Sequence, residues 1–88
     1  MKHAIIDGST VCSMTEIHRL LAEQLAFPAW YGGNLDALHD CLTDLHEDAD
    51  VSIVRPEALL ETLGSAYVRL TRVLSDAAEE NPYLKLHL

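Results

Sequence analysis

The sequence predicts an α/β fold, a small three-stranded parallel sheet packed by about four helices in the order β-αα-β-αα-β. Short β-rich runs lie near the start, the middle and the end of the 88 residues, and two helix-like stretches lie in each gap between them. Because both connections are long and helical, parallel pairing and right-handed crossovers are favoured. A chain of this length is typical of one domain, and we expect residues 1–88 to form it.

The chain begins with a predicted strand at Ala4-Ile5-Ile6, which the turn signal Asp7-Gly8 closes. Ser13 stands three residues before Glu16, the spacing of a capping box at a helix N-terminus. The helix ends before Pro28, because the residue that precedes a proline avoids the α region. The apolar residues of this helix recur at helical spacing, at Ile17, Leu20, Leu21 and Leu25.

A second helix follows the loop PAWYGG, residues 28–33. Asn34 can cap this helix, because its side chain accepts hydrogen bonds from free N–H groups, and we expect the helix to run to about Leu45. At 100° per residue, the helix has an apolar stripe and an acidic stripe on opposite sides. The apolar stripe contains Leu35, Leu38, Leu42 and Leu45, and the acidic stripe contains Asp36, Asp40 and Asp44. The predicted outer patch is therefore Asp36, His39, Asp40 and Thr43.

The second half of the chain repeats this pattern. Val51 to Val54 is the second predicted strand, and Pro56 suits the first turn of a third helix that ends at Gly64. Ser65 can cap a fourth helix, which Asn81-Pro82 stops. The inner stripe of that helix is Ala66, Leu70, Val73, Leu74 and Ala77, and the last strand contains Tyr83, Leu84, Leu86 and Leu88.

The charge of the chain is strongly acidic, with a net charge of −8. This argues against direct binding to nucleic acid, which needs a basic surface, and favours attraction to basic partners. No Lys or Arg occurs between Leu20 and Val54. That stretch contains seven acids: Glu23, Asp36, Asp40, Asp44, Glu47, Asp48 and Asp50.

The acidic stripe and the loop aromatics together indicate a binding surface. A solvated helix face usually mixes charges, because like charges four residues apart repel by about 0.2–0.5 kcal/mol per pair. Trp30 and Tyr31 are both aromatic and lie in the adjoining loop, and paired aromatics of this kind are typical of interface anchors. We expect one of the two rings to pack partly inward and the other to face solvent.

Other sites and compartments are disfavoured by the sequence. The start MKHAIIDG has no apolar signal region, and no run of 18 apolar residues follows, so we expect a cytoplasmic protein that does not enter a membrane. Cys12 and Cys41 are expected to be free and buried, although one disulfide between them stays possible. His39, Cys41 and His46 lack the spacing of metal ligands, so we expect no metal and no cofactor.

Catalysis by this chain is also disfavoured. A hydrolase could use His39 with the nearby carboxylates, but an exposed convex helix lacks the cleft that shifts pKa values. His39, Asp40 and Cys41 are neighbours on a helix and point apart, so they cannot act as a nucleophile and base. We therefore expect no enzyme activity. His18 is interpreted as a partly buried structural histidine.

The chain resembles the barstar family of ribonuclease inhibitors. The resemblance rests on AIIDG near the start, on Ile17-His18, and above all on LAFPAWYGGNLDALHDCLTD, residues 25–44. It implies a barstar-like single domain with a three-stranded parallel sheet. It also implies an intracellular protein whose second helix and preceding loop plug the active site of a barnase-type ribonuclease, without catalysis.

The resemblance assigns partner-binding roles to particular residues. The inhibitory acids match Asp36 and Asp40, with Asp40 in the place of the carboxylate that enters the RNA phosphate pocket. The loop aromatics match Trp30 and Tyr31, and further interface positions match Asn34, Thr43 and Asp76. His39 and Asp44 depart from the prototype, which has tryptophan and glycine there, and Trp30 replaces a tyrosine.

Two functions therefore remain open from the sequence. The first is inhibition of a basic, barnase-like extracellular ribonuclease by a protein that is a monomer when free and forms a 1:1 complex. The second is an immunity or adaptor protein that binds a different basic toxin or enzyme. The departures at His39 and Asp44 bear on the identity of the target.

Overall fold

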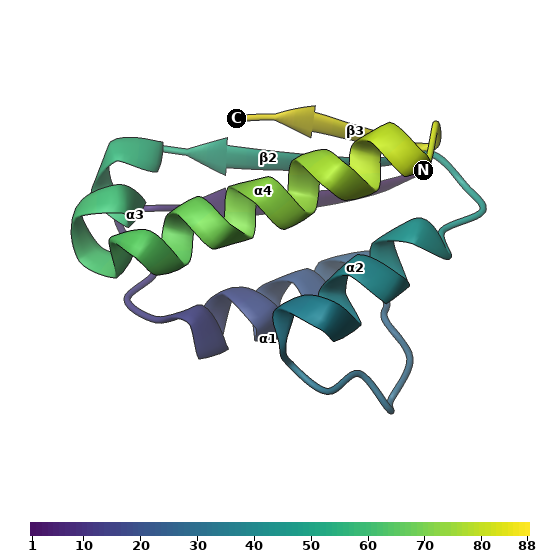
Figure 1. Cartoon of the computed structure of the whole chain (residues 1–88), viewed down its shortest axis with the longest axis horizontal. Helices are drawn as coiled ribbons and strands as arrows, with labels where there is room; N and C mark the ends of the chain where they lie inside the picture. Colours follow the sequence, from purple (N-terminus) through teal and green to yellow (C-terminus); the bar gives the residue numbers. More distant parts are fainter.

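The structure, a computed structural model, describes residues 1–88 and contains three strands and four helices (Figure 1). These are β1 (Lys2–Asp7), α1 (Met14–Leu25), α2 (Leu35–Thr43), β2 (Ala49–Val54), α3 (Pro56–Leu63), α4 (Ser65–Glu80) and β3 (Leu84–His87). The strands form one parallel sheet in the order β1-β2-β3, in which Val51 pairs with Ala4 on one side and with Leu86 on the other. The predicted α/β class and parallel pairing are confirmed.

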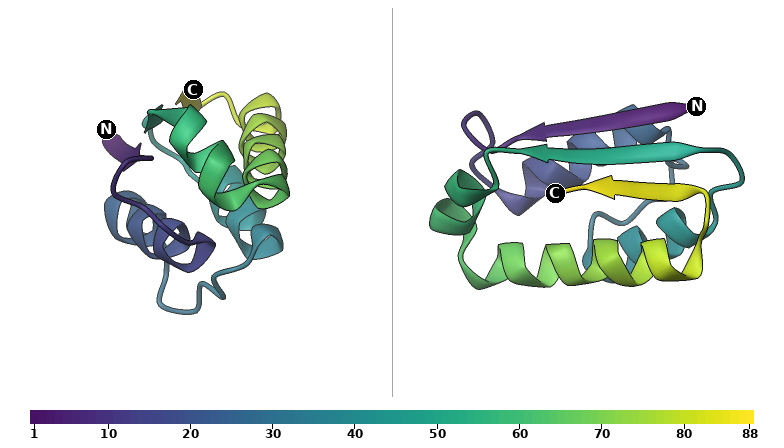
Figure 2. Two further views of the ribbon diagram at one scale, coloured as in Figure 1. Left: turned by 90° about the vertical axis from the view of Figure 1, so that its left-hand side faces the viewer. Right: turned by 90° about the horizontal axis from the view of Figure 1, so that it is seen from above.

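The helices cover one face of the sheet and leave the other face open. α1 packs against β1, α4 packs against β3, and α2 lies along α4 (Figures 1 and 2). Alternate strand residues such as Ala4, Ile6, Val51 and Ile53 are buried, whereas Ile5 is exposed on the opposite face. Parallel sheets are usually covered on both faces, so this one-sided arrangement is unusual.

None of the four helices has the length and apolar character needed to traverse a membrane.

Most predicted helix ends are confirmed. Ser13 caps α1, since its hydroxyl accepts a hydrogen bond from the Glu16 N–H at 3.2 Å, and Asn34 caps α2 in the same way. α2 ends at Thr43, two residues before the predicted end. The predicted cap at Ser65 is wrong, because Gly64 occupies the N-cap position of α4 with a positive φ of 57° and Ser65 is already helical.

Cys12 and Cys41 are both free thiols, but only Cys41 is buried. The prediction that Cys12 is buried is wrong. Cys12 lies in the connection between β1 and α1, where the neighbouring Val11 is buried and Cys12 itself is exposed.

The carboxyl end of α2 is fixed by one buried side chain of the α4–β3 connection. Asn81 is 4% exposed, and its Nδ2 donates to the carbonyl oxygens of Leu42 at 2.8 Å and Leu45 at 3.0 Å. Its Oδ1 accepts from the Tyr83 N–H at 3.0 Å. The Leu42 carbonyl also accepts from the Leu45 N–H at 3.4 Å, so Asn81 adds a side-chain hydrogen bond at the end of α2 and a second one to Leu45, just beyond it. This holds α2 against α4.

The loop between α1 and α2 is fixed from the side of α1. His18 is buried on α1, and its Nδ1 and the Tyr31 hydroxyl form a hydrogen bond. The Tyr31 ring also lies 5.0 Å from the Phe27 ring, centroid to centroid, in a tilted arrangement. The predicted structural role of His18 is therefore to support this loop through its hydrogen bond with Tyr31. The loop lies on the side of the helices away from the sheet (Figures 1 and 2).

We predict that Asn81→Ala destabilises the fold by about 2–3 kcal/mol, because the substitution removes the hydrogen bonds of a buried side chain to the Leu42 and Leu45 carbonyls and to the Tyr83 N–H. Urea unfolding followed by circular dichroism measures this loss. Glu79→Ala is the matched control, since Glu79 is exposed on the same end of α4 and its truncation should change stability by under about 0.5 kcal/mol. Equal stability of the two variants would contradict the assigned role of Asn81.

We predict that His18 makes the protein less stable as the pH falls below about 6.5. Burial lowers the pKa of His18 from its ordinary value of 6.5, so the unfolded chain binds this proton more readily than the folded protein. The contribution is therefore complete above pH 6.5 and declines as the pH falls toward the lowered pKa, with a slope of at most about 1.4 kcal/mol per pH unit. Unfolding of wild type and His18→Gln from pH 8 to 5 measures the difference in slope. Parallel profiles would show that His18 does not contribute.

Candidate functional site

The outer face of α2 presents three carboxylates of one sign. Leu38 and Leu42 are fully buried, which fixes the rotation of the helix about its axis. Asp36, Asp40 and Asp44 are consequently all exposed, and the Asp40 side chain is 74% exposed. The two opposite stripes predicted from helical spacing are therefore confirmed.

These carboxylates have no Lys or Arg partner. The basic side chains that form ion pairs do so elsewhere: Lys2 with Glu47, Arg19 with Glu16 and Glu23, and Arg55 with Asp7. Asp36, Asp40, Asp44 and Asp76 form no ion pair with any of the six Lys and Arg residues. The acidic face of α2 is therefore available to a cation from outside the chain.

His39 is held back from the outer patch. Its ring is half-buried, and its Nε2 hydrogen-bonds with the Glu80 carboxylate of α4. Nδ1 lies 3.9 Å from Oδ1 of Asp40, too far for a hydrogen bond. The sequence predicted His39 as part of the open patch, but its place at the border of that patch puts it within reach of α4. The sequence of α2 does not indicate that Glu80 binds His39, because the two residues are 41 positions apart in the chain.

A second acidic element flanks the first. Asp76 is exposed and lies four residues before Glu80, so both project from the same face of α4. Since Glu80 contacts His39 of α2, that face of α4 borders the acidic face of α2. The structure therefore brings Asp76 to the edge of the surface that contains Asp36 and Asp40.

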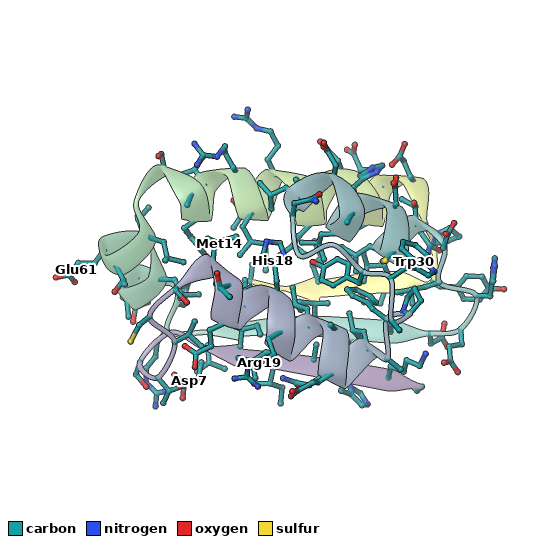
Figure 3. All side chains as sticks on the ribbon, turned by 90° about the horizontal axis from the view of Figure 1, so that it is seen from below. Asp7, Met14, His18, Arg19, Trp30 and Glu61 are labelled. Carbon is teal, nitrogen blue, oxygen red and sulfur yellow. The ribbon has the colours of Figure 1, made fainter.

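The two loop aromatics adopt different positions. Trp30 is 66% exposed, whereas Tyr31 is half-buried against His18 and Phe27. The prediction that one ring packs inward and the other faces solvent is confirmed. Burial, followed by the negative charge that the nearby Cys41 carries once it ionises, raises the pKa of Tyr31 to about 12, so its hydroxyl stays protonated. Figure 3 shows the molecule from the side of α1, α2 and this loop, with His18 and Trp30 labelled.

Asn34 and Thr43 direct polar atoms toward the helix itself. The Asn34 Oδ1 accepts from the Ala37 N–H at 2.8 Å, which leaves its Nδ2 for other contacts. The Thr43 hydroxyl donates to the carbonyls of His39 at 3.0 Å and of Asp40 at 3.1 Å. Both residues define the two ends of α2 and thereby position the acids between them.

Cys41, the cysteine on α2, is not an activated nucleophile. Burial raises the pKa of the Cys41 thiol, and the negative charges of Asp44 and Asp40 raise it further. A thiol with a raised pKa is mostly protonated and therefore weakly nucleophilic. Asp36 and Asp40 line none of the three hollows in the molecular surface. No group of three or more His, Cys, Asp or Glu side chains converges as a metal ion requires. The arrangement is suited to charge recognition.

Comparison with known proteins agrees with this geometry. The family model described as "Barstar (barnase inhibitor)" matches residues 1–86. A protein of Bacillus subtilis (strain 168) named "Putative ribonuclease inhibitor YrdF" is 36% identical over 81 residues, which cover 91% of this chain and 89% of that relative. The match extends over nearly the entire chain, including α2 and the loop that precedes it. This chain therefore belongs to the barstar family.

Proposed function

We propose that this protein inhibits a basic, barnase-type ribonuclease by binding over its RNA site in a 1:1 complex. The observation that supports this most strongly is the pair of exposed carboxylates of Asp36 and Asp40, which have no Lys or Arg partner, on one face of a well-anchored helix. Family membership and the name of the Bacillus relative support the general role of ribonuclease inhibitor.

The chemistry of an RNA site explains why carboxylates suit this role. Such a site holds phosphates with Arg, Lys and His side chains, and carboxylates form the same charge-assisted hydrogen bonds with these groups. A helix fixed by Asn81 and by buried leucines holds its carboxylates in place before binding. Less side-chain and backbone freedom is then lost on association, which favours tight binding.

Within this proposal the residues have distinct roles. Asp40, one turn of α2 from Asp36 and the more central of the two, enters the phosphate pocket of the ribonuclease. Trp30 supplies exposed aromatic area at the neighbouring edge, and Tyr31 supports the loop from beneath. Asp76 extends the negative surface over α4 and meets basic groups at the rim of the ribonuclease site.

The comparisons point to an inhibitor and not to an enzyme, and the local chemistry supports the same role. The His39 ring is paired with Glu80, the Cys41 thiol has a raised pKa, and Asp36 and Asp40 lie outside any hollow. A hydrolytic use of His39 with these carboxylates is therefore not proposed.

A second candidate is an immunity or adaptor protein for a basic target that does not cleave RNA. Two observations favour a target that differs from barnase itself. His39 is tied to Glu80, and Asp44 adds an exposed charge at the end of α2. Affinity capture with the wild-type protein, followed by RNA-cleavage assays of the captured protein, distinguishes the candidates. A basic partner without ribonuclease activity would favour the second.

We predict that Asp40→Asn weakens inhibition of a barnase-type ribonuclease by at least about thirtyfold, because loss of a central interface charge typically costs about 2 kcal/mol or more. The measurement is the inhibition constant from cleavage of a fluorogenic RNA substrate. Asp48→Asn makes the same chemical change at an exposed aspartate outside α2 and should inhibit nearly as well as wild type. If Asp40→Asn also inhibits like wild type, α2 does not occupy the RNA site.

We also predict that association becomes slower as ionic strength increases, because complementary charge accelerates encounter and salt screens it. Stopped-flow measurements from about 0.02 to 1 M NaCl should show a fall of roughly tenfold or more in the association rate constant. The double variant Asp36→Asn/Asp40→Asn should show a shallower dependence. The idea fails if the rate constant of wild type does not depend on salt.

A further inference from the structure

A hollow of about 380 Å³ lies beside the acidic face, between the α1–α2 loop and the carboxyl end of α2. One wall comes from the end of α1 and the loop, and the other comes from the residues that follow α2. Its lining includes Phe27, Pro28, Trp30, Asp44 and Leu45. None of the roles proposed above uses this hollow, although Trp30 and Asp44 border both it and the acidic surface.

The size and walls of the hollow suit one long side chain with an apolar stem. Its volume is near the lower end of the range of roughly 300–1,000 Å³ that is typical of small-molecule pockets. Phe27, Pro28 and Leu45 supply apolar wall area, and the exposed Trp30 ring stands at the mouth. A folded surface of a partner cannot enter such a space, whereas a projecting side chain can.

Two acids, Asp44 and Glu47, and two basic residues, Lys2 and His46, line the hollow. Glu47 forms an ion pair with Lys2 at 2.9 Å, and this pair lowers the pKa of Glu47. Asp44 has no cationic partner. An occupant with a positive end therefore gains an attraction to Asp44 that an apolar occupant lacks.

We propose that this hollow receives an arginine side chain of the protein partner. The guanidinium lies between the Asp44 carboxylate and the Trp30 ring, and the alkyl stem lies against Phe27 and Leu45. Arginine fits better than lysine, because its planar group stacks on aromatic faces, is more weakly hydrated and forms two parallel hydrogen bonds with a carboxylate. The inference rests on the proposed binding of a basic protein, and it assigns to Asp44 and Trp30 a selective role separate from that of Asp36 and Asp40.

The test uses the free protein and a small probe, so it does not depend on any ribonuclease. Nα-acetyl-arginine amide is titrated into ¹⁵N-labelled protein, and Nα-acetyl-lysine amide and Nα-acetyl-leucine amide serve as comparison probes. Amide and indole resonances report the location of binding. Trp30 is the only tryptophan of the chain, so its fluorescence reports directly on the mouth of the hollow. The same titrations are made with Asp44→Asn and with the matched control Asp48→Asn.

The expected result is saturable binding of the arginine probe at residues of this hollow, tighter than that of the other two probes. Asp44→Asn should weaken it by about two- to fivefold, while Asp48→Asn leaves it unchanged. Equal binding of the leucine and arginine probes, an equal effect of the two variants, or no saturable shift would overturn the proposal.

The proposal and the proposed function fail in distinguishable ways. Loss of the probe result with intact ribonuclease inhibition removes the arginine pocket alone. Probe binding without inhibition of any ribonuclease removes the proposed function and directs the search to another arginine-bearing partner.

Discussion

The burial of Leu38 and Leu42 is the constraint on which the proposed surface depends. Both side chains are fully buried in the core, so α2 has one rotation about its axis in which Asp36, Asp40 and Asp44 face solvent. Asn81 then holds the carboxyl end of the helix by donating to the carbonyls of Leu42 and of Leu45, which lies just beyond it. The His18–Tyr31 contact fixes the loop that leads into it. Three separate anchors thus hold one short helix and its loop.

The charged residues that stabilise the fold differ from those that we propose bind the partner. Neighbouring aspartates on α2 repel one another by about 0.2–0.5 kcal/mol per pair, and no cation of the chain relieves this repulsion through an ion pair. The basic side chains stabilise other parts of the molecule, such as the Asp7–Arg55 contact that joins the ends of β1 and β2. A cationic partner would relieve the repulsion on binding. The same feature that weakens the free helix therefore strengthens the complex that we propose.

Local patterns in the sequence predicted the elements of the fold, whereas contacts between distant elements could not be predicted. The cap at Ser13, the helical start at Pro56 and the opposite stripes of α2 follow from spacing alone, and the structure confirms each of them. The His39–Glu80 bond and the clamp at Asn81 depend on the packing of α2 along α4. The prediction that Asn81-Pro82 ends the fourth helix is correct, but nothing in the pair indicates that the Asn81 side chain also bonds to the end of α2. The failed cap at Ser65 shows that a capping residue type does not secure the capping position when a glycine with positive φ precedes it.

The central claim is that the acidic face of α2 occupies the RNA site of the target, and competition tests it most directly. The measurement is the apparent affinity of this protein for a catalytically inactive barnase-type ribonuclease, at increasing concentrations of a non-cleavable oligodeoxynucleotide that fills the RNA site. We expect mutually exclusive binding, in which the apparent dissociation constant increases in proportion to the oligonucleotide concentration once that concentration exceeds the oligonucleotide's own dissociation constant. A ternary complex, with an affinity that does not change as the RNA site fills, would contradict it.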